Sequence, residues 1–313
     1  MIKRISNFLV GLLVIGGVLA GAYWFLNDES VQLSDELKRE AVGFHFKGGQ
    51  GTTHFELTGP ETAPVVVLVH GVSGPMQVWD KTAPALVAAG YRVLRYDLFG
   101  RGLSERVKGD YQSGLFDRQL YDLIVGLKLA TPVTMVGSSM GAIVSSNFAN
   151  QHPELVKRLV LIGPAGFPIE ASPAAALMGV PVVGDYVMGT VGGRMLPTHH
   201  RKYFVNPDRF PEMQKAFDAQ LKVAGTKRAI LSTMRTMPVN DFSAGYEKVG
   251  RSHTPVLLLW GVADRTFPYY HHKKARQLMP QSVFISVPDA AHLPQYEMPE
   301  LTNQAIINFL GQS

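Results

Sequence analysis

The pentapeptide Gly137-Ser138-Ser139-Met140-Gly141 lies directly between an apolar run and a segment with helical character. The apolar run at residues 131–136 predicts a strand, and residues 142–150 predict a helix. A strand, a G-x-S-x-G turn and a helix in direct succession need small residues beside the central serine, because the backbone turns sharply there. This order predicts a tight turn that exposes the Ser139 hydroxyl above a sheet, which restricts the chain to folds that offer such a sheet edge.

The chain begins with a strongly apolar segment. Lys3 and Arg4 precede it, and its core at residues 8–26 is long enough to span a bilayer. Positive charges before a span predict a cytoplasmic N-terminus and a main domain on the non-cytoplasmic side. Cleavage of a signal peptide is the alternative, because residues 18–22 have small-residue spacing, and the domain would then be secreted or periplasmic. The apolar run continues through Trp24, past the possible cleavage sites, which favours an uncleaved anchor.

Apolar runs then alternate with helical patterns. Eight runs predict strands, at residues 43–47, 53–57, 64–70, 91–96, 133–136, 158–162, 256–260 and 283–287. The first two are expected to form an antiparallel pair. Helices are predicted at residues 78–89, 117–129, 139–150, 269–279 and 299–310. Strands that alternate with helices predict an α/β fold with a mostly parallel, eight-stranded sheet covered on both faces.

This alternation stops between residues 164 and 254, where Gly, Pro, Met and Ala are frequent and only helical patches occur. An insertion that cannot form sheet predicts a helical cap, or lid, over the site. Six of the twelve methionines lie in it, and they either wall an apolar site or pack the insertion's own core. We therefore expect an anchor or signal segment at 1–27, a linker at 28–40, an α/β core at 41–165 and 251–313, and a cap at 166–250.

Composition excludes several classes of function. The chain has no cysteine, which excludes disulfides, thiolate catalysis and cysteine-ligated zinc. Its net charge of +5 is scattered without a basic stripe, so nucleic acid is not predicted as a partner. The histidine pairs at 199–200 and 271–272 lack the i,i+4 spacing of a helical zinc site, and no metal site is predicted. No dinucleotide fingerprint follows a strand, so no cofactor is predicted.

A candidate acid and a candidate base follow later strands, after Ser139 in the chain. Asp264 and His292 each come after a strand, where active sites of open α/β sheets lie. Histidine can take the Ser139 proton and return it at neutral pH, and a carboxylate holds its tautomer. Asp289 is expected to be a turn residue, and Asp241 is a remote alternative acid in the insertion.

Two further loops complete the predicted site. His70 and Gly71 follow the first buried strand, and the turn there would let the Val72 N–H join the Met140 N–H in an oxyanion hole. His70 is expected to brace this loop by hydrogen bonds. Asp97, after the next strand, is likewise expected to brace its glycine-hinged loop instead of serving as the catalytic acid.

These motifs together resemble the α/β-hydrolase superfamily over roughly residues 43–312. The resemblance rests on His70-Gly71, Asp97 with Gly100-x-Gly102-x-Ser104, the turn at 137–141, Gly261 with Asp264, and His292-x-Pro294 with Glu297-x-Pro299-Glu300. It implies a Ser139–His292–Asp264 triad and a helical cap inserted after the sixth strand.

Serine at the turn distinguishes the chain from haloalkane dehalogenases and epoxide hydrolases, whose nucleophile is aspartate. The anchor and residues 136–141 are most similar to membrane-anchored monoacylglycerol lipases and related carboxylesterases. Ala142 and Ala291 replace glycines that many relatives carry, which weakens the assignment to a subfamily but not the triad. The expected activity is hydrolysis of carboxylic esters, monoacylglycerols or other acyl esters, through an acyl-enzyme. A C–C bond hydrolase with the same triad, using Arg194 or Arg235 to hold an acidic substrate, and a non-catalytic binder are the alternatives.

Overall fold

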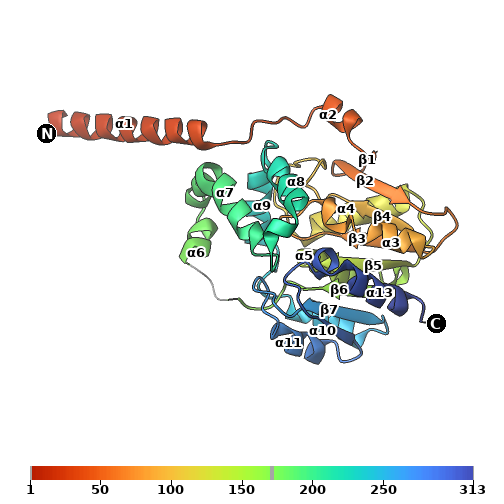
Figure 1. Cartoon of the computed structure of the whole chain (residues 1–313). Helices are drawn as coiled ribbons and strands as arrows, with labels where there is room; N and C mark the ends of the chain where they lie inside the picture. The colour runs from red at the N-terminus through yellow and green to blue at the C-terminus, as the bar shows by residue number, and fades with distance from the viewer. Residues whose placement is uncertain (1, 170–172, 313) are drawn as a thin grey trace.

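The computed structural model describes residues 2–169 and 173–312. At its centre lies one eight-stranded sheet with strand order β1-β2-β4-β3-β5-β6-β7-β8 (Figure 1). The strands are β1 (Phe44–Lys47), β2 (Thr52–Thr58), β3 (Val65–Val69), β4 (Arg92–Tyr96), β5 (Val133–Ser138), β6 (Val156–Ile162), β7 (Val256–Gly261) and β8 (Val283–Val287). Strands β3 to β8 pair in parallel, and β1 and β2 pair antiparallel. The predicted fold class, a mostly parallel eight-stranded sheet, is confirmed.

Helices cover both faces of this sheet. One face carries α4 (Ser113–Gly126), α5 (Met140–Gln151) and α11 (His271–Leu278), and the other carries α3 (Ala83–Ala88), α12 (Pro294–Glu297) and α13 (Pro299–Leu310). Every residue of β3, β5 and β7 is buried between these layers. This explains their continuous apolar runs, because a parallel strand with both faces covered has no solvent side.

The helix predicted at residues 78–89 is wrong in its extent. The structure has a 3-10 turn at Met76–Trp79, and α3 begins only at Ala83. Pro84 explains the break, since proline is tolerated in the first turn of a helix but not in its interior.

Between β6 and β7 the described residues form helices and no strand of the sheet. The helices are α6 (Pro173–Gly179), α7 (Val183–Arg201), α8 (Pro211–Leu221), α9 (Thr226–Thr236) and α10 (Ser243–Arg251). Helix α10 packs against α5 and α11, whereas α7, α8 and α9 pack on one another. Helices α6 to α9 share an apolar core of their own, formed by Met178, Met188, Leu196, Phe217, Leu221, Ile230 and Leu231. Several of the insertion's methionines therefore pack the insertion itself.

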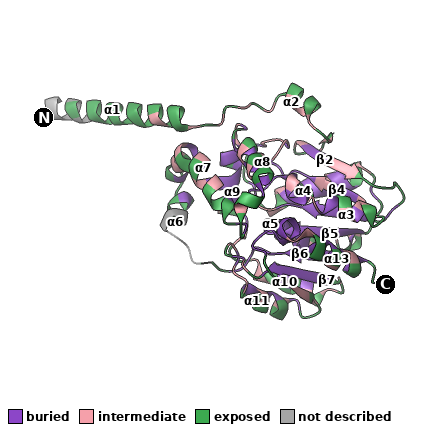
Figure 2. Ribbon diagram, viewed as in Figure 1, coloured by how far each residue is buried: buried purple, intermediate pink, exposed green. Residues whose placement is uncertain are grey.

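The N-terminal segment is a long helix, α1 (Ile2–Leu26), that projects from the rest of the molecule. Its stretch Leu9–Leu26 has a mean hydropathy of 2.2 and is 0% buried. Figure 2 shows this exposure along the helix, in contrast with the buried sheet. By length and composition it can cross a membrane, and a signal sequence near an N-terminus has the same properties.

The residues after α1 are bound to the helices of the insertion. We call residues 28–31 the strap. Asp28 forms an ion pair with Lys227 Nζ at 2.7 Å, and the Lys227 side chain is only 2% exposed. Val31 donates its N–H to Lys222 O at 2.8 Å and accepts from Ala224 N at 2.8 Å. The N-terminal segment is thus fixed to the α8–α9 connection, although the sequence predicted only a linker there.

Candidate active site

The turn after β5 has the geometry that its sequence predicts. Ser139 lies between β5 and α5 with φ 57° and ψ −122°, a conformation that costs energy for a residue with a side chain. A Cβ atom on Gly137 would overlap the Gly141 carbonyl, and one on Gly141 would overlap the carbonyl of Val69 in β3. The sequence needs glycine at both positions because the backbone of the turn lies directly against itself and the neighbouring strand.

Asp264 and His292 form a buried pair. His292 Nδ1 lies 2.8 Å from Asp264 Oδ2, and their side chains are 1% and 0% exposed. The other carboxylate oxygen, Oδ1, accepts the N–H groups of Thr266 at 2.8 Å and Phe267 at 3.0 Å. A carboxylate held in this way accepts the Nδ1 proton, which leaves Nε2 as the basic nitrogen. Among the described residues, His292 Nε2 is buried and has no hydrogen-bond partner.

The turn and this pair meet at one edge of the sheet. Ser139 N–H donates to Ile162 O at 2.9 Å, and Gly163 follows Ile162 directly. A Cβ atom on Gly163 would lie 3.3 Å from Asp264 Oδ2 and 3.4 Å from His292 Nδ1. The backbone at the end of β6 therefore touches the serine turn on one side and the acid–base pair on the other. All three predicted catalytic residues lie at the carboxyl ends of the strands.

The two predicted oxyanion donors lie beside the serine. Within the described part of the chain, neither the Val72 N–H nor the Met140 N–H donates a hydrogen bond. Met140 begins α5, and the first N–H groups of a helix lack partners within the helix. Gly71 brings the other loop close, since a Cβ atom there would lie 3.0 Å from Ser139 Cβ. Two free N–H groups thus flank the serine turn.

His70 and Asp97 brace loops, as their sequence positions predicted. His70 is fully buried, donates from Nδ1 to Gly71 O at 2.8 Å and accepts Leu98 N–H on Nε2 at 2.9 Å. Burial lowers the pKa of His70 to about 4, so the ring is neutral. Burial alone would raise the pKa of Asp97, but the hydrogen bond and charge of His54 outweigh it and lower that pKa to about 2.

Comparison with known families matches residues 64–299, well over half of the chain, to the alpha/beta hydrolase fold. The chain belongs to this family. The α/β-hydrolases include proteins of several activities, and the relatives of this chain show that range.

Among curated relatives, the dihydrolipoyllysine-residue acetyltransferase component of the acetoin cleaving system of Pseudomonas putida is 29% identical, over 84% of this chain and 67% of the relative. The 2-hydroxy-6-oxononadienedioate/2-hydroxy-6-oxononatrienedioate hydrolase of Comamonas testosteroni is 25% identical, over 79% of this chain and 87% of the relative. Among solved structures, a thermophilic esterase from Thermogutta terrifontis superposes with a TM-score of 0.73 at 24% identity, covering 86% of this chain and 98% of the esterase. These similarities support a hydrolase and leave its substrate open.

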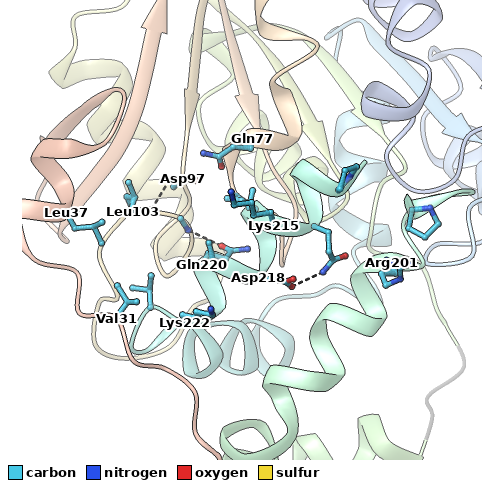
Figure 3. A pocket seen from close by; sticks show the side chains of 18 of the residues that line it. Val31, Leu37, Gln77, Asp97, Leu103, Arg201, Lys215, Asp218, Gln220 and Lys222 are labelled. Carbon is cyan, nitrogen blue, oxygen red and sulfur yellow. Dashed lines mark hydrogen bonds between the residues drawn. The ribbon is translucent and has the colours of Figure 1, made fainter. Parts of the chain in front are cut away.

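A cavity of about 790 Å³ lies beside the strap and α8 (Figure 3). Its lining includes Val31 and Leu37 from the N-terminal segment, Leu103, and the α8 residues Lys215 and Gln220. Ser139, Asp264 and His292 are not among its lining residues. This α/β-hydrolase therefore has a hollow next to its candidate site that the three predicted catalytic residues do not reach.

Sequence reasoning missed Tyr203, which follows α7 and contacts His292. The backbone carbonyl of Tyr203 accepts the backbone N–H of His292 at 2.9 Å. The tyrosine ring lies edge-on to the imidazole, with ring centroids 4.9 Å apart. No motif marks a tyrosine in an insertion of irregular sequence, so only the tertiary structure places it at the site.

His200, one turn before Tyr203, makes a pH-dependent contribution to stability. Its ring stacks on Phe217 with centroids 4.1 Å apart, and burial lowers its pKa from 6.5 to about 4. The imidazole of His200 is therefore protonated near pH 6.5 in the unfolded chain but only near pH 4 in the folded chain. The free energy of unfolding decreases as the pH falls from 6.5 to about 4. The expected loss from this group is about 2 kcal/mol between pH 7.5 and pH 5.

His200→Phe keeps the stacked ring but removes the titrating group. We expect the decrease in free energy of unfolding between these two pH values, measured by urea denaturation, to be smaller in His200→Phe than in wild type. Equal decreases in the two proteins would contradict this assignment.

Proposed function

We propose that this protein is a membrane-tethered serine hydrolase that cleaves carboxylic esters, with monoacylglycerols or related acyl esters as substrates. The observation that carries the proposal is the buried His292–Asp264 pair next to a strained serine turn. Among residues 2–169 and 173–312, His292 Nε2 and the two N–H groups that flank the turn have no hydrogen-bond partner. This combination supplies a nucleophile, a base and an oxyanion site together.

In the proposed reaction, Ser139 Oγ attacks the ester carbonyl while His292 Nε2 accepts the hydroxyl proton. The Val72 and Met140 N–H groups bind the oxygen that becomes negative. His292 then gives the proton to the leaving alcohol as the C–O bond breaks, which leaves an acyl-enzyme. Water attacks this acyl-enzyme with His292 again as base, which releases the carboxylic acid and restores the Ser139 hydroxyl. Asp264 holds the imidazole and stabilises its protonated form.

The test is an activity profile on p-nitrophenyl esters of increasing acyl length, beside 1- and 2-monoacylglycerols. The proposal expects turnover of esters, and a preference that extends to medium or long chains would support the lipid substrate. Failure to hydrolyse any ester, with cleavage of a ring-fission dienedioate instead, would replace the ester proposal by the C–C hydrolase alternative.

The arginines of the insertion give the C–C hydrolase alternative little support. Arg235 is bound to Asp185 at 3.0 Å and to the Met178 carbonyl at 2.9 Å, and Arg194 is exposed on α7. Neither arginine that the sequence offered for an acidic substrate is free in the site. A non-catalytic binder would have no need of a buried His292 Nε2 that lacks a partner among the described residues, beside a strained serine.

The membrane part of the proposal is supported by where apolar side chains lie. Tyr23 near the end of α1 contacts Tyr186 in α7, and Figure 1 shows α6 and the start of α7 at the end of the molecule where α1 departs. Exposed apolar residues gather there, namely Leu177, Val180, Val182, Val183 and Val191. We call this surface the apolar tip. A surface of this kind beside a membrane span fits contact with the same bilayer.

Because the chain has no cysteine, a single thiol can report this contact. Val182 in the tip is 78% exposed, and Val42, between α2 (Asp35–Glu40) and β1, is 79% exposed. We expect an environment-sensitive fluorophore on Val182→Cys, but not on Val42→Cys, to be quenched by spin-labelled lipid in vesicles.

A third label, on Leu13→Cys in α1, separates the possible outcomes. Quenching at Leu13 alone would keep the anchor and reject the tip contact, while quenching at none of the three would reject the membrane proposal altogether. Ester hydrolysis in detergent is independent of either result.

A further inference from the structure

The oxyanion loop, which we define as Gly71–Ser73, is held from outside the α/β core. Both the hydroxyl and the carbonyl of Ser73 bind side chains of the insertion. Ser73 Oγ lies 3.0 Å from the Tyr203 hydroxyl, and Ser73 O accepts a hydrogen bond from Gln220 Nε2 at the end of α8. Gln220 Oε1 in turn accepts Gly102 N–H at 3.1 Å. Both side chains are buried, so water does not substitute for these bonds.

The carbonyl of Val72 is fixed by a third contact. Arg101 Nε donates to Val72 O at 2.8 Å, and the same guanidinium donates from Nη2 to Thr233 Oγ1 in α9 at 2.7 Å. Arg101 is fully buried and forms no ion pair among the described residues. A buried cation is costly unless its donors are satisfied, so these hydrogen bonds determine where the guanidinium lies.

We infer that the insertion positions the oxyanion hole. Gln220, Tyr203 and Arg101 with Thr233 are positioning residues that hold the peptide of Val72 so that its N–H faces the site of the developing charge. Their side-chain hydrogen bonds act through the loop, whereas the ring of Tyr203 also packs on the His292 imidazole, a contact that phenylalanine at this position retains. The inference rests on the proposed function, because the loop matters to catalysis only if Val72 binds an oxyanion.

The strap connects this arrangement to the N-terminal helix. Val31 is hydrogen-bonded to Lys222 and Ala224, a few residues after Gln220 in the chain, and Lys227 at the start of α9 binds Asp28. The segment that carries Gln220 and Thr233 is therefore held on its outer side by the residues that follow α1. Anchor, strap, insertion and oxyanion loop form one continuous set of contacts.

The test uses the full chain and two variants, of which Tyr203→Phe removes one hydrogen bond of Ser73, and Gln220→Met removes the bonds to both Ser73 O and Gly102 N–H. Tyr203→Phe removes only the hydroxyl that meets Ser73, and Gln220→Met removes the amide at nearly the same volume. Tyr296→Phe is the matched control, because its hydroxyl also joins the insertion to the core, at Glu212 Oε1 of α8 at 2.9 Å, but does not touch the loop. The readouts are the rate constant of labelling by a fluorophosphonate, and kcat and KM for p-nitrophenyl butyrate.

We expect labelling and kcat to fall about tenfold in each variant, less than the loss of an oxyanion donor itself, with KM nearly unchanged. Tyr296→Phe should keep both rates near wild type. A rise in KM without a fall in kcat would overturn the inference. Labelling rates and kcat equal to those of Tyr296→Phe, in variants with unchanged Tm, would overturn it as well. A lowered Tm with labelling equal to wild type below the transition would overturn it too, by showing a purely structural role.

These outcomes are separable from failure of the proposed function. If the wild-type chain neither reacts with the fluorophosphonate nor turns over any ester, the proposed function fails. If wild type reacts and both variants react equally fast, only the positioning role fails.

Discussion

Replacing Ser139 by alanine should reduce kcat for ester hydrolysis roughly a millionfold, to the level left by binding and the oxyanion site alone. The hydroxyl oxygen is the atom that bonds to the acyl carbon, so nothing else in the site can form the acyl-enzyme. The backbone strain at φ 57° is retained with alanine, and the fold should be unchanged. Steady-state kinetics on the best p-nitrophenyl ester, with Tm as the check on folding, measures the effect.

The neighbouring serine provides the matched control. Ser138 is buried, and its Oγ accepts a hydrogen bond from Gln295 Nε2 at 3.3 Å. Ser138→Ala should keep kcat within about tenfold of wild type, because a long neutral hydrogen bond contributes only modestly. Comparable losses in Ser138→Ala and Ser139→Ala would show that the turn, and not the Ser139 hydroxyl, is what the activity requires.

Asp264→Asn should reduce kcat by about ten-thousandfold at neutral pH. Asp264 accepts the Nδ1 proton of His292 at 2.8 Å, and an amide NH2 in that place favours the tautomer with its proton on Nε2. The ring then cannot take the Ser139 proton, although it stays in position. The loss is expected mainly in kcat, with little change in KM.

Asp289→Asn is the corresponding control. Asp289 is exposed and has φ 57°, a backbone conformation that asparagine tolerates well. It lies three residues before His292 and was the nearest competing acid in the sequence. Activity near wild type is expected, and a large loss there with a small loss in Asp264→Asn would exchange the roles of the two carboxylates.

The sheet could be predicted because the pattern that marks each strand lies within a few consecutive residues. The valine run at Val65–Val69 is apolar at every position, and a strand buried on both faces needs that composition. Ser139, Asp264 and His292 could likewise be expected at one place, because each follows a parallel strand directly or after a short loop, and the carboxyl ends of parallel strands lie at one edge of the sheet. Chain order along the sequence was enough to bring these three residues together.

The contacts of the insertion and the strap had no such signal. Gln220 and Tyr203 lie in an irregular segment, and each reaches the oxyanion loop through packing between residues more than a hundred positions apart. The Val31 bridge to Val223 involves one residue from a polar linker, which no periodicity can reveal. Such contacts depend on how helices dock, and that is a property of the whole fold.

The most direct test of the proposed nucleophile is the site of covalent reaction with a fluorophosphonate. We expect one adduct per chain, located by peptide mass spectrometry on Ser139, formed by the folded wild type, lost on heat denaturation and absent from Ser139→Ala. An adduct that persists in Ser139→Ala, or no adduct on a folded wild-type chain, would contradict it.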